Sequence, residues 1–103
     1  MKLLTNDIYK RVEKILYNYK NITDENTKRG LIELGKFFNG TDHMYFIENY
    51  YYKRDAYRNR CPKNSTLFEY ICKKLYIEKP TLYIIKKEVI YKAAMIFYKN
   101  GVI

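Results

Sequence analysis

Two helical patterns, separated by a tight break, lie within residues 68–89. Apolar residues recur there at spacings of three and four, as they do along the buried face of an α-helix. The first pattern contains Ile71, Cys72 and Leu75, and the second contains Leu82, Ile85 and Val89. Ile77 lies in the break, and Pro80 falls near the start of the second pattern, where its missing N–H costs little. We therefore expect two helices that meet at a sharp turn, one over 67–75 and one over 79–98.

The spacing of these residues is the one that a helix-turn-helix requires. Two helices that cross steeply need apolar side chains at the fourth, eighth, tenth, fifteenth and eighteenth positions of a unit of roughly 20 residues. Counting Phe68 as the first position, these places hold Ile71, Leu75, Ile77, Leu82 and Ile85. The fifth position faces the second helix closely and favours a small side chain, and Cys72 occupies it. The pattern predicts a helix-turn-helix over residues 65–99.

The segment ICKKLYIEKPTLYIIKKEVIYKAA resembles the fourth region of sigma-70-type factors. It is equally similar to the C-terminal helix-turn-helix of small phage late-gene regulators of the RinA and ArpU type. The positions that match the family pattern are Ile71, Leu75, Ile77, Thr81 and Leu82. The resemblance covers the C-terminal third of the chain. It implies a phage or prophage regulator that binds double-stranded DNA and contacts RNA polymerase.

Three positions depart from the family pattern. Tyr76 stands where the family often has a glycine, which tolerates a positive φ. A tyrosine held in that left-handed region costs about 1 kcal/mol. Glu78 stands where the family usually has a serine cap, and it is a weaker N-cap than serine. Ile84 occupies a position that is often arginine.

The second helix of such a motif enters the major groove, while the first approaches the DNA backbone. Exposed cations bind phosphates or guanine edges, and a threonine contacts a base or a thymine methyl group. The residues that we expect to contact DNA are Lys73, Lys74, Lys79, Thr81, Tyr83, Lys86 and Lys87, with Arg58 and Arg60 from the preceding loop region. The solvated face of any basic helix also carries lysines, so each single contact remains open.

The positive charge is concentrated in the half of the chain that contains this motif. Residues 1–50 hold 8 Lys and Arg against 7 Asp and Glu, for a net charge of +1, whereas residues 51–103 hold 12 against 4, for +8. A polyanionic partner suits this asymmetry. A composition rich in Lys, Tyr and Asn also arises from an AT-rich genome, but that origin does not explain why the halves differ.

The remaining patterns predict an all-α chain, folded as a compact bundle of about five helices in a single domain over 1–103. Three supporting helices are expected in residues 1–58: one over 5–19, one that ends near Phe38, and one over 43–54. Gly30 and Gly35 lower the helix propensity of the second of these helices. We expect that they are there to let another helix pack closely against it. Its inner face is expected to hold Leu31, Leu34, Phe37 and Phe38. The third is expected to turn Met44, Ile47 and Tyr51 inward, with Phe46 and Tyr50 on a flank.

No residue pattern points to an enzyme, a metal or another cofactor. His43 has no accompanying nucleophile or carboxylate pattern, and the sequence contains no phosphate loop, HExxH or CxxC motif. Cys61 and Cys72 are expected to be free thiols. The sequence contains no signal peptide and no membrane-spanning run, so we expect a cytoplasmic protein.

The sequence supports three functional hypotheses. The first is a transcription regulator with a DNA-binding helix-turn-helix, whose N-terminal helices pack behind it and contact RNA polymerase or a second protomer in a homodimer. The second is a small terminase-like protein that binds phage DNA for packaging. The third is a helical protein-binding module whose lysines contact an acidic partner.

Overall fold

The computed structural model describes residues 4–103, which form an all-α bundle with no strand among the described residues. The elements are α1 (Asn6–Tyr17), the 3-10 turn η1 (Tyr19–Asn21), α2 (Glu25–Phe38), α3 (Asp42–Phe46), the π-helical segment η2 (Ile47–Tyr52), α4 (Arg54–Arg60), α5 (Leu67–Leu75) and α6 (Lys79–Lys99). The predicted fold class is confirmed. The bounds of α5 and α6 agree closely with those that the sequence predicts.

Side-chain caps fix the start of most helices. Thr5, Asp24, Thr41 and Thr66 each accept a hydrogen bond from a backbone N–H in the first turn of α1, α2, α3 and α5, respectively. In α6 the N-cap Glu78 makes no such bond, and Pro80 lies in the first turn instead. The starts of these four helices are therefore encoded locally, and the predicted starts at residues 5, 43 and 67 lie within one residue of the observed starts of α1, α3 and α5.

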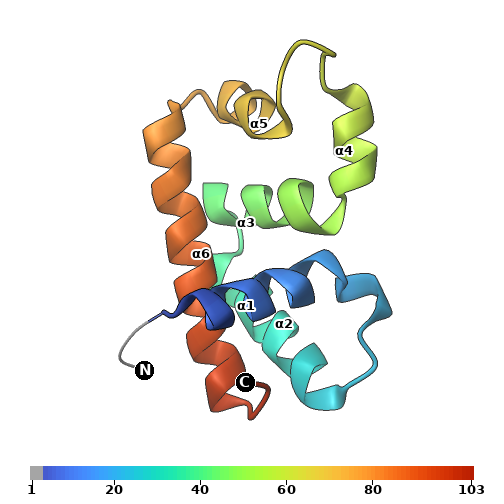
Figure 1. Ribbon diagram of the computed structural model, residues 1–103, viewed down its shortest axis with the longest axis vertical. Helices are drawn as coiled ribbons and strands as arrows, with labels where there is room; N and C mark the ends of the chain where they lie inside the picture. The colour runs from blue at the N-terminus through green and yellow to red at the C-terminus, as the bar shows by residue number, and fades with distance from the viewer. Residues whose placement is uncertain (1–3) are drawn as a thin grey trace.

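α6 is the central element of the bundle and runs along nearly the whole length of the molecule (Figure 1). It contacts α1, α2, α3 and α5. Its buried residues are Leu82, Ile85, Val89, Ile90, Ala93, Ala94, Ile96 and Phe97. The C-terminal half of α6 lies beside α1 and α2, whereas its N-terminal half meets α5 at the opposite end of the molecule (Figure 1).

Gly30 lets α2 approach α6 closely. A Cβ atom at this position would lie 2.8 Å from Cδ1 and 2.9 Å from Cε1 of the Phe97 ring, which is closer than side-chain atoms pack. Phe97 itself is fully buried. The expectation of close helix packing is thus confirmed for Gly30. It is wrong for Gly35, which has no atom within 4 Å of the equivalent point.

The single helix predicted over 43–54 is wrong. α3 ends at Phe46 and passes into η2, where the Lys53 N–H donates to the Glu48 carbonyl five residues back. The chain then changes direction at Lys53 and forms α4. The wider π turn allows Phe46, Ile47 and Tyr51 all to be buried, and α4 adds Tyr57 to the same core. No local sequence signal marks this break.

Two side chains face differently from the prediction. Phe37, expected on the inner face of α2, is 57% exposed, and Phe46, expected on a flank, is fully buried. The close approach of α6 at Gly30 explains the first difference, because it turns the Gly30 and Leu34 side of α2 toward the core and leaves Phe37 outside. The π turn explains the second.

The α2–α6 contact yields a prediction on stability. Gly30→Ala should lower the free energy of unfolding by about 1–3 kcal/mol, because the added methyl group overlaps the Phe97 ring. Gly35→Ala adds a methyl group where no other atom is near, so it should raise the same free energy by about 0.5–1 kcal/mol through higher helix propensity. Chemical denaturation of the two variants measures both. Equal effects at the two positions would contradict the packing described here.

Candidate nucleic-acid interface

A left-handed turn joins α5 to α6. Tyr76 adopts φ 58° and ψ 43°, and its N–H donates to the Lys73 carbonyl at 3.3 Å. The Ile77 N–H donates to the Cys72 carbonyl at 3.1 Å. These two bonds define a Schellman motif, which usually has glycine at the position of Tyr76. The turn therefore forms with a tyrosine in the strained position, and this side chain is 94% exposed.

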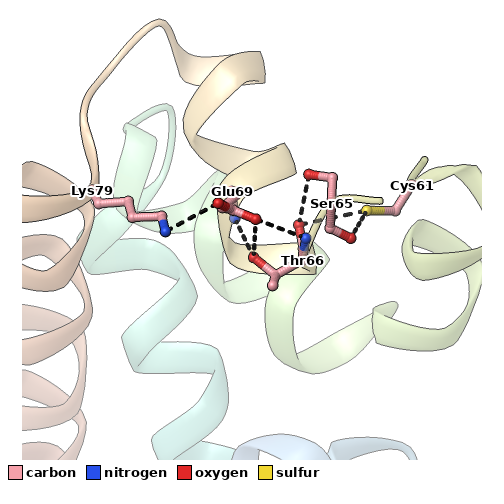
Figure 2. A network of polar contacts seen from close by, with 5 residues as sticks. All are labelled: Cys61, Ser65, Thr66, Glu69 and Lys79. Atoms are coloured by element: carbon pink, nitrogen blue, oxygen red, sulfur yellow. Dashed lines mark hydrogen bonds and ion pairs between the residues drawn. The ribbon is translucent and has the colours of Figure 1, made fainter. Parts of the chain in front are cut away.

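A polar network ties the start of α6 to the start of α5 (Figure 2). Thr66 and Glu69 form a capping box: the Glu69 N–H donates to the Thr66 hydroxyl at 3.1 Å, and the Thr66 N–H donates to the Glu69 carboxylate at 3.0 Å. Lys79 pairs with the same carboxylate at 3.0 Å. Hydrogen bonds from the Thr66 backbone and from Lys79 lower the pKa of Glu69 to about 2. The network links the starts of the two helices across the turn.

Cys61 holds the loop before α5 against the same network. Its Sγ donates to the Ser65 carbonyl at 3.3 Å (Figure 2). Cys61 and Cys72 are both free thiols, as predicted. The loop therefore follows the cap of α5 closely and brings the end of α4, with Arg58 and Arg60, to the same end of the molecule as α5 (Figure 1).

Most of the residues expected to contact DNA are exposed on this end and along the start of α6. Those with exposed side chains are Arg58, Arg60, Lys73, Lys74, Lys79, Thr81, Tyr83 and Lys87. Lys79 is engaged with Glu69, and the Tyr83 ring packs against Phe68 with centroids 4.5 Å apart. Lys74 lies 5.3 Å from the centre of the Tyr70 ring. The end of α4, α5 and the first turns of α6 thus lie at the same end of the molecule, which carries these exposed cations (Figure 1).

Lys86 does not belong to this surface, contrary to the expectation. Its side chain is only 18% exposed, and its ammonium group lies 3.6 Å from the Glu13 carboxylate of α1. The same Glu13 oxygen accepts a hydrogen bond of 2.7 Å from the buried Tyr51 hydroxyl. Lys86 also lies 5.2 Å from the centre of the Tyr50 ring. It joins α6 to α1 and η2, so its charge balances a half-buried carboxylate.

The outer face of α6 is more apolar than the basic face that the sequence predicts. Ile84, Tyr91, Met95 and Tyr98 are all exposed along it, with Lys87 and Glu88 between them. The buried stripe of α6, which contains Leu82, Ile85 and Val89, is enough to predict a helix from the sequence. The second apolar pattern, on the opposite face, is therefore easily overlooked. A signal is nonetheless present, because positions 84, 91 and 98 lie seven residues apart.

An apolar groove of about 500 Å³ lies beside this outer face. Its lining residues are Leu4, Phe37, Phe38, His43, Lys87, Glu88, Tyr91, Lys92 and Met95. His43 stacks on Phe38, with ring centroids 4.9 Å apart, and its Nε2 lies 3.1 Å from the Glu88 carboxylate. This single histidine therefore connects α3 to α6 at the rim of the groove.

Among residues 4–103, no cluster of three or more histidine, cysteine, aspartate or glutamate side chains could hold a metal ion. None of the helices in this part of the chain is sufficiently long and apolar to cross a membrane. No protein-family model matches the sequence, and no curated protein or solved structure matches it either.

The strained turn gives a second prediction. Tyr76→Gly should raise the free energy of unfolding by about 1 kcal/mol, because glycine reaches the left-handed region without the tyrosine's steric cost. Gly40 provides the reverse control: it has φ 78°, and a Cβ atom added there would have no other atom within 4 Å. Gly40→Ala should lower stability by a similar amount. Thermal or urea denaturation checks both, and a destabilised Tyr76→Gly variant would contradict the assigned turn.

Proposed function

We propose that this protein binds double-stranded DNA through α5 and the first turns of α6, as a transcription regulator of the sigma region 4 type. The observation that carries the proposal is the joint between these helices. A capped helix, a left-handed turn and a second helix leave Thr81 and its neighbours exposed at the end of the molecule. Helix-turn-helix proteins use such an arrangement to bring a helix N-terminus to base edges in the major groove.

The distribution of charge supports the proposal. The exposed cations at this end include Arg58 and Arg60 from α4, Lys73 and Lys74 from α5, and Lys79 from α6. Such residues position a protein on the phosphate backbone, whereas a short polar side chain near the start of the second helix reads bases. Thr81 is such a side chain, in the first turn of α6. Binding should weaken steeply with salt, because each phosphate contact releases counterions.

The phage origin and the contact with RNA polymerase are parts of this proposal that rest on the resemblance of residues 71–94 alone. A helical protein-binding module is the second candidate. The exposed apolar residues Ile84, Tyr91 and Met95 favour it, since a purely DNA-facing helix has no need of them.

Thr81→Glu offers a direct test of the DNA proposal. Thr81 lies in the first turn of α6, where a carboxylate suits the helix dipole and leaves the fold intact. The same carboxylate would face the phosphates and remove a base contact. We expect DNA affinity to fall by at least about tenfold, given that one good base contact contributes ~1–3 kcal/mol. Fluorescence anisotropy with labelled duplex DNA at low salt measures this.

Asn26→Glu is the matched control. Asn26 is exposed in the first turn of α2, so the substitution changes the net charge equally at an equivalent place in another helix. It should leave DNA affinity nearly unchanged, and both variants should keep the wild-type melting temperature. Equal losses in the two variants would indicate only long-range electrostatics. Unchanged binding by Thr81→Glu would exclude the start of α6 from the interface.

A further inference from the structure

The loop between α4 and α5 forms one wall of a small surface pocket. The pocket has a volume of about 260 Å³, and its lining residues are Arg58, Cys61, Pro62, Lys63 and Ser65. This lining contains two cations and a hydroxyl group, and no carboxylate from the described residues contributes to it. Cations and hydroxyl groups are the side chains that contact phosphate oxygens in proteins. The chemistry of the pocket therefore suits a phosphate group.

Neither cation of the pocket is neutralised within the described part of the chain. Lys79, at the same end of the molecule, pairs with Glu69. By contrast, none of the ion pairs among residues 4–103 includes Arg58 or Lys63. Both of these side chains are exposed. An anion that enters the pocket thus meets two positive charges and does not have to displace a carboxylate first.

Hydrogen bonds within the loop hold the pocket in shape. The Cys61 N–H donates to the Arg58 carbonyl at 3.0 Å, and the Ser65 N–H donates to the Pro62 carbonyl at 3.1 Å. The Cys61 thiol closes the loop from the other side by donating to the Ser65 carbonyl at 3.3 Å. Pro62 adds a fixed φ. The loop is therefore ordered before any ligand binds, which reduces the entropy that binding costs.

We propose that this pocket binds one phosphate group of the DNA backbone, and that Arg58 and Lys63 contact that same phosphate. The inference rests on the proposed DNA binding and extends it to a site outside α5 and α6. The loop lies at the same end of the molecule as α5 and the start of α6 (Figure 1). A backbone phosphate carries no sequence information, so the pocket contributes affinity and register at any DNA sequence, whereas Thr81 contributes the preference for particular bases.

The salt dependence of DNA binding tests whether the two cations share one phosphate. Arg58→Gln and Lys63→Gln should each weaken binding, and the double variant should weaken it further. The slope of log affinity against log salt changes by about 0.9 for each phosphate contact. Removing both cations should therefore make the slope shallower by about 0.9, whereas cations on two separate phosphates would give about 1.8. Fluorescence anisotropy with labelled duplex DNA at several salt concentrations measures this.

Lys28→Gln/Arg29→Gln is the matched control. It removes the same two residue types from exposed positions in α2, at the other end of the molecule. The control should keep the wild-type slope, and all variants should keep the wild-type melting temperature because the altered side chains are exposed. A slope change near 1.8 in the Arg58→Gln/Lys63→Gln variant, or a change no larger than that of the control, would overturn the shared phosphate site.

Inorganic phosphate identifies the ligand without DNA. Added at constant ionic strength, it should shift the backbone amide resonances of residues 61–66 in the wild-type protein, and the Arg58→Gln/Lys63→Gln variant should lose these shifts. Shifts of equal size around exposed lysines elsewhere would show that the pocket has no preference for phosphate, and they would overturn the proposal.

The outcomes separate the pocket from the DNA proposal. If Thr81→Glu loses DNA affinity while the Arg58→Gln/Lys63→Gln variant binds with wild-type affinity and slope, the pocket proposal fails and the DNA interface at α6 stands. If the wild-type protein binds no duplex DNA, the proposed function fails. Phosphate shifts at residues 61–66 in that case would show a phosphate site whose ligand is not DNA, which overturns the source proposed here.

Discussion

The packing of α6 against α2 is the contact on which the rest of the structure depends. Because Gly30 has no side chain, Phe97 can lie against the backbone of α2 and anchor the C-terminal half of α6 in the core. The Lys86–Glu13 pair adds a tie to α1 near the middle of the helix. Near its start, the buried side chains of Leu82 and Ile85 hold α6 to the core as well, so its first turns keep a fixed direction at the end of the molecule.

The joint with α5 also determines the direction of the first turns of α6. The Schellman bonds at Tyr76 and Ile77 form the turn between the two helices, and the Glu69–Lys79 pair links their starts. The strain at Tyr76 is tolerated because the core on both sides determines where the chain must go. A rigid joint matters for the proposed function, since side chains read bases only when their helix is held in a defined position relative to the phosphate contacts.

The sequence was most informative where structure is decided locally. The caps Thr66 and Thr41, the apolar stripe of α6 and the break around Ile77 all lie within a few residues of the features that they determine. The sequence-based predictions were wrong where a contact with a residue far along the chain determines the local structure. The π turn depends on burying Tyr51 against Glu13, 38 positions earlier in the chain. Lys86 points inward because it pairs with the same Glu13 carboxylate, and no sequence feature near position 86 indicates this pairing. The exposed apolar residues on the outer face of α6 are easily overlooked in the sequence, because the buried stripe on its inner face is enough to predict the helix.

The two halves of α6 thus have different surroundings: its C-terminal half packs against α1 and α2, and its N-terminal half packs against α5 and leaves one face exposed. The most direct measurement of the proposed role of the start is a map of backbone amide chemical shifts during titration with duplex DNA at low salt. The largest changes should fall within residues 58–63 and 73–83, with α1 and α2 unchanged. Changes concentrated on α1 and α2, or no changes at all, would contradict the assignment of this end as the nucleic-acid interface.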